Sequence, residues 1–286
     1  MNEFDLRMLA VLNETHNITK AAEQLFLTQS ALSKRISALE QDLNITLLAR
    51  TQQGVRFTPD GEKVLSYTSQ AETLFQNMRN QLTLDKGIIS STLNLGVTNN
   101  YAQFCLTDVF IPFRLAYPHI TTNIITNHSR KILAQLEDGI LDVAIIRGEH
   151  HWSEKTVLLN TENICAIRCQ DDKDKPLHSI PYIGRLTDNL LDRKITKWLH
   201  ENDLITNQPG INVENIITCV SMVEHGLGWA IIPEIALHSF SGIVTPLVYK
   251  DGTPLLHHTY LVYSDRSRRL PQINAFIEMI LSQFNL

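Results

Sequence analysis

Residues 17–58 read NITKAAEQLFLTQSALSKRISALEQDLNITLLARTQQGVRFT, and this stretch decides the fold of the first part of the chain. Apolar residues first recur at i, i+3, i+4 and i+7, the spacing of one helix face, at Ile18, Ala21, Ala22 and Leu25. Thr28 is a suitable N-cap for a second helix, whose apolar stripe is Leu32, Ile36, Leu39 and Leu43. Two short helices this close in sequence pack at a steep angle, so the pattern predicts a helix-turn-helix.

The outward face of the second predicted helix carries amide, hydroxyl and ammonium groups, which hydrogen-bond to base edges and phosphates. Residues 47–58 then alternate around Gly54, which predicts a β-hairpin that would lie along a phosphate backbone as a wing. Arg35 would serve either phosphates or the packing of the domain itself. The DNA-contacting residues that we expect are Thr28, Gln29, Ser30, Ser33, Lys34, Arg35, Arg50 and Arg56.

The composition is that of an ordinary globular protein of about two or three domains. The chain has 286 residues, 43% hydrophobic and 19% charged, with a net charge of −5, so any DNA contact must be local. Residues 20–58 carry five basic and three acidic residues, a balance of +2. This weak positive charge fits a protein that needs two copies of the module to hold its site.

Signals for export or membrane insertion are missing from the sequence. Residues 1–5 lack the basic and apolar regions of a signal peptide, and no run approaches ~18 uncharged apolar residues. The four cysteines form no CxxC pair, which suits a reducing compartment. A cytoplasmic protein that does not enter a membrane is therefore expected.

A long helix is predicted over residues 59–85, because Thr58-Pro59 is a helix-start signal. Its residues form an imperfect 4-3 heptad seam, which favours dimerisation over packing on its own domain alone. Residues 85–91 contain helix breakers and would act as a hinge. The two sets of seam residues are Val64, Ala71 and Met78, and Thr68, Phe75 and Leu82.

From about residue 92 the pattern changes to alternating strands and helices, which implies a doubly wound α/β sheet. The fold class is thus α+β multidomain, with a winged helix-turn-helix at 1–58, a linker helix at 59–88 and a two-subdomain α/β domain at 89–286. The closing helix, 270–284, is predicted to return to the first α/β set. We therefore expect subdomain I at about 89–161 and 265–286, subdomain II at about 162–264, and a ligand cleft between them.

Residues 1–85 resemble the DNA-binding head and linker helix of LysR-type transcriptional regulators. The resemblance rests on ITKAAEQL at 18–25, TQSALSKRI at 28–36, Leu39-Glu40, residues 47–50 and FTPDGE at 57–62. It extends through DVAI at 142–145 and GLGWAIIP at 226–233. It implies a periplasmic-binding-protein-like effector domain, dimers that pair into tetramers, a small-molecule inducer, and contact with RNA polymerase at a dyad-related promoter site.

The second half is also similar to a narrower group, the regulators of citrate and central carbon metabolism such as catabolite control protein E. This similarity rests on IIRG at 145–148, Thr218-Cys219 and LPQ at 270–272. It implies a di- or tricarboxylate effector. That group would carry an arginine near His257, and this chain has none there, which leaves citrate itself open.

The resemblance places the effector against the first strand's loop, a helix N-terminus and a hinge strand. The residues point the same way, because hydroxyls, amides and helix-start N–H groups form an anion cradle. Arg147 ends an apolar strand, where it would hold a carboxylate or instead pair with Glu149 or another acid. The turn asparagines and the histidine have simpler structural explanations as well. The expected effector residues are Thr98, Asn99, Asn100, Ser129, Ile146, Arg147, Thr218 and His257.

The sequence thus predicts a DNA-binding regulator controlled by a small anionic metabolite, with no cofactor and no metal ion. An amino acid, an aromatic acid or a redox signal through cysteine would be the alternative effectors. A solute-binding receptor would need a signal peptide and no head. An enzyme fused to a DNA-binding domain would need a nucleophile–base or metal set, and no GxSxG, HExxH or P-loop is present.

Overall fold

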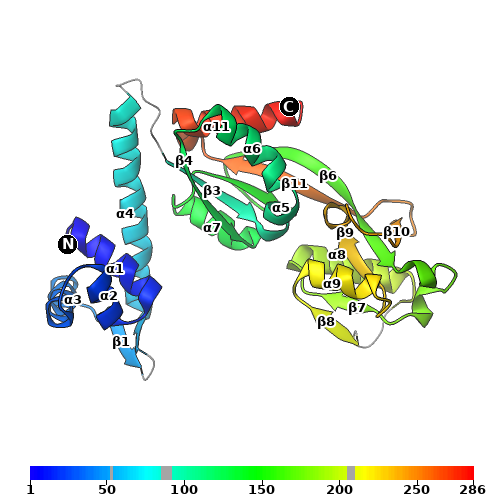
Figure 1. The fold of residues 1–286 in the computed structure, drawn as a ribbon, viewed down its shortest axis with the longest axis horizontal. Coiled ribbons are helices and arrows are strands. Elements are labelled where there is room, and N and C mark those ends of the chain that lie inside the picture. The colour runs from blue at the N-terminus through cyan, green and yellow to red at the C-terminus, as the bar shows by residue number, and fades with distance from the viewer. Residues whose placement is uncertain (52–53, 85–91, 205–209) are drawn as a thin grey trace. The chain divides into compact units, whose positions relative to one another are not determined.

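The computed structural model describes residues 1–51, 54–84, 92–204 and 210–286 (Figure 1). It divides into two compact units, residues 1–88 with 137–140, and residues 89–136 with 141–286. The predicted hinge at 85–91 lies outside the described residues.

The first unit begins with three helices, α1 (Glu3–Thr15), α2 (Ile18–Gln24) and α3 (Gln29–Leu43). The Asn17 side chain caps α2 and the Thr28 hydroxyl caps α3, accepting from the backbone N–H of Ala31 at 3.2 Å. The predicted helix-turn-helix is confirmed. Burial of each leucine side chain contributes about 1.5–3 kcal/mol to the stability of the fold. The core that the helices share consists of Met8, Leu9, Leu12, Ala21, Ala22, Leu25, Leu32, Ile36, Leu39, Leu47 and Val55.

The predicted hairpin forms from β1 (Leu48–Thr51) and β2 (Gly54–Phe57), which pair antiparallel. Its second strand is tied to the end of α1, because the backbone N–H of Val55 donates to the His16 carbonyl at 2.9 Å. Gly54 has φ +128°, and a Cβ there would collide with that same carbonyl. Glycine is therefore required where the wing meets the helices.

The linker helix α4 spans Pro59–Leu84. The Thr58 hydroxyl accepts from the backbone N–H of Gly61 at 3.0 Å, as the helix-start signal predicts. Val64 and Leu65 pack against the core of the helix-turn-helix, so the first turns of α4 belong to that core. Of the predicted seam, Thr68 is buried and Phe75 is 49% exposed, while the Met78 and Leu82 side chains lie outside the described residues. The dimer seam stays a prediction.

Subdomain I of the second unit is built on β3 (Thr92–Thr98), β4 (Thr121–Asn127), β5 (Val143–Arg147) and β11 (Leu256–Tyr263). Strand β3 pairs parallel with both β4 and β5, and β11 pairs antiparallel with β5, so the sheet is mixed. The side chains of β5 alternate between the two faces. Val143 and Ile145 join the core with Phe113 and Phe276, whereas Ala144 and Ile146 join a separate core with α7.

Helices cover both faces of this sheet, as a doubly wound fold requires. One face carries α5 (Asn99–Phe104), α6 (Leu106–Ala116) and the closing helix α11 (Pro271–Gln283), and the other carries α7 (Ser129–Glu137). In Figure 1, α11 and α6 lie together, which confirms that the last helix returns to the first α/β set. Between β3 and β4 the chain forms two consecutive helices, α5 and α6.

Strand β6 (Lys155–Arg168) joins the two subdomains. Its first part pairs with β11 in subdomain I, and its second part pairs with β9 (Ala230–Pro233) and β10 (Ile243–Pro246) in subdomain II. The remaining elements are β7 (Ile183–Arg185), β8 (Ile211–Val213), α8 (Asn189–Glu201), α9 (Ile216–Glu224), α10 (Asp265–Arg268), and the short 3₁₀ turns η1 (Gln170–Asp172), η2 (Leu177–Ser179) and η3 (Glu234–Ala236).

The predicted division places all of residues 256–263 in subdomain II. In the structure they form β11, of which Thr259–Tyr263 pair with β5 in the sheet of subdomain I. An apolar strand pattern shows that a strand is buried but does not show which sheet it joins, and this sheet accepts an antiparallel strand beside β5.

Candidate nucleic-acid interface and effector site

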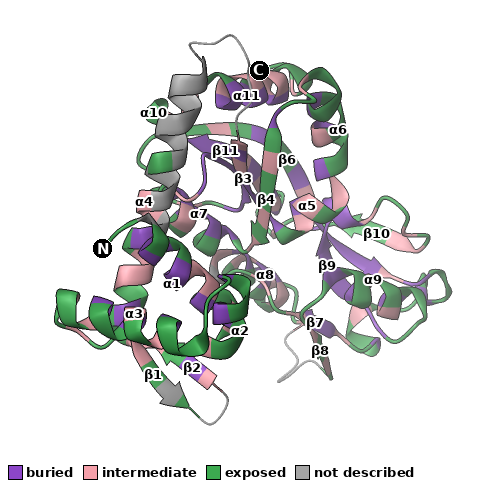
Figure 2. Cartoon of the chain, turned by 60° about the vertical axis from the view of Figure 1, so that its left-hand side comes forward, coloured by how far each residue is buried: buried purple, intermediate pink, exposed green. Residues whose placement is uncertain are grey.

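The outer face of α3 is made mainly of exposed residues, as the burial colours show (Figure 2), and most of those residues are polar. The Gln29 amide donates to the Ser33 hydroxyl at 3.1 Å, and the hydroxyls of Thr28 and Ser30 lie 3.2 Å apart. Because these groups bond one another while exposed, they can exchange those partners for base edges at little desolvation cost. This face has the groups that a major-groove recognition helix needs.

The cations around this face differ in whether they form ion pairs with other described residues. Lys34 and Arg56 are exposed, and neither forms an ion pair with any described residue. Arg35 is held by Asp5, with Nε 2.6 Å from Oδ1 and Nη2 2.7 Å from Oδ2. Of the two roles considered for Arg35, the structure thus shows packing within the first unit. The Arg50 side chain lies outside the described residues.

Asp5 is completely buried, and it also accepts the backbone N–H of Asn2 at 2.7 Å. Burial raises its pKa, but the hydrogen bonds from Arg35 and from Asn2 outweigh it and hold the pKa below the ordinary value. The pair therefore fixes the start of α1 against α3.

In the second unit, Arg147 ends β5 on the face shared with α5, as strand alternation from Val143 and Ile145 requires. The sequence predicts a guanidinium at the carboxyl edge of the sheet, and the structure places it there but buried, with only 4% of the side chain exposed. Burial lowers its pKa to about 10, which leaves it charged at pH 7. It is an interior arginine.

The partner of Arg147 is Glu162 on β6, whose side chain is 7% exposed. Glu149, the partner considered from the sequence, bonds Lys194 at 2.8 Å instead. The second carboxylate oxygen of Glu162 accepts the backbone N–H of Ile235 in η3 at 2.6 Å. Glu162 therefore links subdomain I to subdomain II, and sequence reasoning missed it.

Six buried polar atoms at this ion pair have no hydrogen-bond partner among the described residues. They are the hydroxyls of Thr98 and Tyr101, the Nε atoms of Arg147 and Arg185, and the two atoms that meet in the ion pair without hydrogen-bond geometry, Nη2 of Arg147 and Oε1 of Glu162. Register pairing of Val97 with Ile145 puts Thr98 and Arg147 at the same sheet edge. Besides burial, the charge of Arg185 lowers the pKa of Arg147, and the charge of Arg147 opposes the rise that burial causes in the pKa of Tyr101, so these groups lie near one another. Buried donors without acceptors are rare in native proteins, so this group is a candidate ligand site.

Three other predicted effector residues lie near the ion pair, and each is engaged in contacts within the protein. The Ser129 hydroxyl, at the start of α7, donates to the Arg147 carbonyl at 2.7 Å. Ile146 packs in the core against α7. His257 is buried opposite Glu162 in the β11–β6 pairing. Burial, with a smaller contribution from Arg147, lowers the pKa of His257 well below its usual value, so the ring is neutral.

The last three predicted residues are less buried than this group. Asn99 and Asn100 begin α5, with Asn99 exposed and Asn100 partly buried. Thr218 is exposed in the first turn of α9, where its backbone N–H donates to Asn215. Their roles in ligand binding stay predictions.

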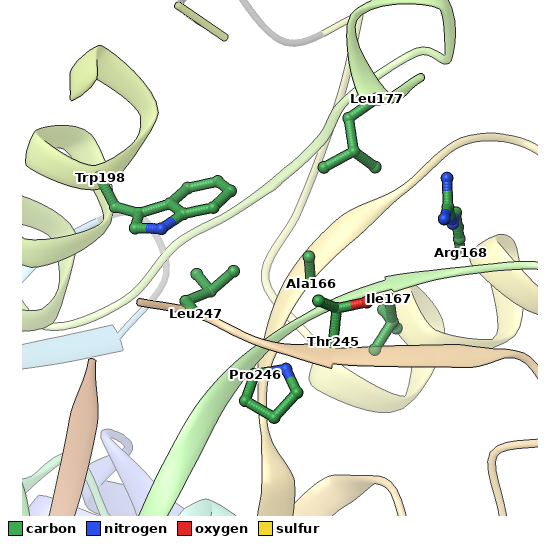
Figure 3. Close-up of a pocket in the computed structure, with 8 residues that line it drawn as sticks. All are labelled: Ala166, Ile167, Arg168, Leu177, Trp198, Thr245, Pro246 and Leu247. Carbon is green, nitrogen blue, oxygen red and sulfur yellow. The ribbon is translucent and has the colours of Figure 1, made fainter. Parts of the chain in front are cut away.

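A cavity of about 160 Å³ lies elsewhere in subdomain II (Figure 3). Trp198, Leu177, Leu247 and Ala166 line it, with Arg168 at one side. None of the predicted effector residues contributes to it.

The cysteines are free and three of them are buried. Burial raises the pKa of Cys165 and of Cys219 to about 11, which keeps both as unreactive thiols at pH 7. Among the described residues, no group of three or more His, Cys, Asp or Glu side chains is placed to hold a metal ion. No helix within the described ranges is long and apolar enough to cross a membrane.

Comparisons with known proteins agree with both halves of the structure. Residues 4–62 match the family model described as bacterial regulatory helix-turn-helix protein, lysR family, and residues 86–285 match the LysR substrate binding domain. The uncharacterized HTH-type transcriptional regulator YraN of Bacillus subtilis is 30% identical over 281 residues, covering 98% of this chain and 97% of that protein. YkuM of the same organism is 29% identical over 279 residues, 96% and 95% of the two chains.

Solved structures show the same fold. The crystal structure of CbnR, a LysR family transcriptional regulator, has a TM-score of 0.72 at 16% identity, covering 99% of each chain. Full-length CbnR in complex with its target DNA has a TM-score of 0.72 at 17% identity, again covering 99% of each.

Proposed function

Because the chain belongs to the LysR family of bacterial helix-turn-helix transcriptional regulators, we propose that a small carboxylate bound between its effector subdomains controls its action on DNA. The family is one of DNA-binding regulators, so the chain is a transcriptional regulator and not an enzyme.

The observation that carries this proposal is a pair of arginines, one from each subdomain, of which Arg147 is buried and Arg185 is partly buried. Arg147 ends β5 and Arg185 ends β7, and the Nε atom of each is buried without an acceptor. Guanidinium groups hold carboxylates through paired N–H donors. The Thr98 and Tyr101 hydroxyls would add two further hydrogen bonds to the same ligand.

A thermal-shift screen of the full chain tests the ligand class. Succinate, citrate, glutamate and benzoate would be compared at constant ionic strength, and we expect at least one to raise the melting temperature. Arg185→Met should abolish that rise, whereas Arg168→Met, which removes an arginine beside the separate cavity, should keep it. If Arg147→Ala and Arg185→Met both bind the ligand as wild type does, the carboxylate proposal fails.

On the DNA side, two heads would read a dyad-related site, with α3 in the major groove and the hairpin along the backbone. The α4 helices would pair two chains, dimers would pair into tetramers, and the bound complex would act on RNA polymerase. An inducer would favour one of two assembly shapes.

The pairing of α4 is tested by two substitutions on the same helix. Phe75 lies on the predicted seam and is 49% exposed, and Tyr67 lies off it and is 71% exposed. Phe75→Asp should dissociate the dimer and Tyr67→Asp should not, as measured by analytical ultracentrifugation. Equal behaviour of the two variants would contradict the seam.

A further inference from the structure

Glu162 occupies an unusual position at the junction of the subdomains. One carboxylate oxygen meets the Arg147 guanidinium and the other accepts the Ile235 backbone N–H at 2.6 Å. The ion pair thus spans β5, the crossing strand β6 and η3. The next residue, Asn163, makes a second link between β6 and η3, in which β6 supplies the donors. Its backbone N–H and its side-chain amide donate to Glu234 in η3 at 3.1 and 3.0 Å.

The burial of this pair restricts access to Arg147. The side chains of Arg147 and Glu162 are only 4% and 7% exposed. A ligand carboxylate therefore cannot reach the charged Nη2 from solvent while Glu162 remains on it. Either Glu162 moves or the ligand does not touch that atom.

Two carboxylates cannot share this guanidinium at low cost. A buried charge is tolerated when it is paired, and removing the partner of a buried charge is strongly unfavourable. A second carboxylate at Arg147 would lie beside the like charge of Glu162 in a poorly solvated space, and only the more distant charge of Arg185 would offset it. The ligand and Glu162 therefore compete for Arg147.

Building on the proposed function, we propose that Glu162 is an internal competitor of the effector, which holds Arg147 in the ligand-free protein and is displaced when an anion binds. Displacement also frees the Ile235 N–H in η3. Ligand binding would thus loosen one of the two links between β6 and η3, at the point where the chain passes between subdomains.

Competition from the Glu162 carboxylate also restricts which ligands can bind. A carboxylate tethered beside Arg147 acts at a high effective concentration, so an acid with one carboxylate and nothing else competes poorly. A second anionic group on Arg185, with hydroxyl contacts from Thr98 and Tyr101, would supply the missing affinity. The class of effector is therefore a small acid with at least two carboxylates rather than a simple monocarboxylate.

The test compares wild type, Glu162→Gln and Glu234→Gln in the full chain. Glutamine keeps the size of residue 162 and an acceptor for the Ile235 N–H, but it removes the charge that competes for Arg147. Glu234→Gln is the matched control, because it removes a neighbouring carboxylate that bonds Asn163 rather than Arg147. Sodium acetate and sodium succinate would be titrated at constant ionic strength, with sodium chloride as reference.

We expect Glu162→Gln to bind succinate at least tenfold more tightly than wild type and to gain a melting-temperature rise in acetate that wild type lacks. Glu234→Gln should behave as wild type. An unchanged or weaker response of Glu162→Gln to both anions would overturn the internal competitor. If Glu234→Gln gained as much as Glu162→Gln, a general change in charge would explain the result and the proposal would also fail.

The outcomes separate this inference from the proposed function. Succinate binding to wild type with no gain in Glu162→Gln keeps the carboxylate effector and removes the competitor. Acetate binding to Glu162→Gln, with no binding of any acid to wild type, keeps the competitor and removes the effector class.

Glu162→Asp keeps the test decisive if Glu162→Gln does not fold. It retains the charge but withdraws the carboxylate from Arg147 by one methylene group, so we expect an intermediate gain in succinate affinity. Affinity equal to wild type in a folded Glu162→Asp protein would overturn the proposal.

Discussion

In each unit of this molecule an arginine pairs with a buried carboxylate. The two pairs differ in the burial of the arginine and in the hydrogen bonds that it makes. In the first unit Arg35 is 40% exposed and meets a fully buried Asp5 through two hydrogen bonds of 2.6 and 2.7 Å. In the second unit Arg147 and Glu162 are both buried, and the Nε atom of Arg147 has no acceptor among the described residues.

The difference separates a pair that holds two helices together from the pair that we propose to meet the effector. The Arg35–Asp5 pair joins two helices of one small core, and Asp5 has a further donor in the Asn2 N–H. The Arg147–Glu162 pair joins strands that serve different subdomains and leaves donors unused. Satisfied polar networks make a structure rigid, whereas buried donors without acceptors are groups that a bound ligand could satisfy.

The largest expected effect comes from breaking the buried pair on one side. Arg147→Met leaves Glu162 as an uncompensated interior charge, which costs about 3–5 kcal/mol, while Arg147→Met with Glu162→Leu should be near wild type or more stable. All three tryptophans lie in the second unit, so tryptophan fluorescence during urea unfolding follows this unit. Equal destabilisation of the single and double variants would contradict a strongly coupled pair.

A third carboxylate sharpens the comparison because it is buried without a cation. Burial raises the pKa of Asp142 to about 6, although the backbone N–H and the amide of Asn94 both donate to it. The folded state then keeps a proton that the unfolded state releases, so stability falls as pH rises from the unfolded pKa to about 6. A shift of roughly two units corresponds to about 3 kcal/mol.

Asp142→Asn should remove that fall, which urea unfolding followed by tryptophan fluorescence at pH 4, 5, 6 and 7 would detect. A wild-type stability that rises relative to Asp142→Asn over this range would show the opposite sign and contradict the burial argument.

The pair in the first unit should have a smaller effect and the opposite dependence on pH. The pKa of Asp5 is held below its ordinary value, so its stabilisation is present above the unfolded pKa of about 3.9 and is lost as pH falls through the folded pKa. Asp5→Asn should cost about 1–3 kcal/mol at pH 7. Helical circular dichroism measures this, with Asp60→Asn, from the exposed Asp60–Lys63 pair, as a control expected within about 0.5 kcal/mol. If Asp60→Asn lost as much unfolding free energy as Asp5→Asn, the buried and the exposed ion pair would not differ in strength as expected.

The smallest expected effects are on DNA affinity and separate Arg35 from its neighbours. Lys34→Ala and Arg56→Ala should each reduce the dependence of log K on log salt by about one unit, because each removes one phosphate contact. A double Asp5→Leu/Arg35→Met variant should keep the wild-type slope. Fluorescence anisotropy on a site selected from random DNA would measure the DNA affinity of all three variants at several salt concentrations. A reduced slope in the double variant would show that Arg35 contacts phosphates.

The sequence predicts the elements whose signals are local. Thr28 caps α3 and Pro59 begins α4 as expected, because a cap or a proline acts on the residues beside it. The position of Arg147 at a sheet edge follows from the apolar strand before it. The same signal, an arginine ending an apolar strand, is present at Arg185 and would have added it to the predicted site.

The contacts that close the site depend on the path of the chain and are not local. Glu162 reaches Arg147 only because β6 crosses between subdomains beside β11, and the sequence does not show which strands pair. Tyr101 lies in the first turn of α5 directly after the predicted loop residues, so helical spacing from Thr98 would have indicated it. The Ser129 hydroxyl is engaged by the carbonyl of Arg147, a contact between α7 and β5 that no local signal in the sequence indicates.

The proposed exchange of Glu162 for an anionic effector on Arg147 is tested most directly by a crystal structure. The crystal would hold the full chain with the di- or tricarboxylate that gives the largest thermal shift. We expect the ligand carboxylate on Arg147, a second group on Arg185, and Glu162 withdrawn from both Arg147 and the Ile235 N–H. A bound ligand with the Arg147–Glu162 pair intact would contradict this exchange.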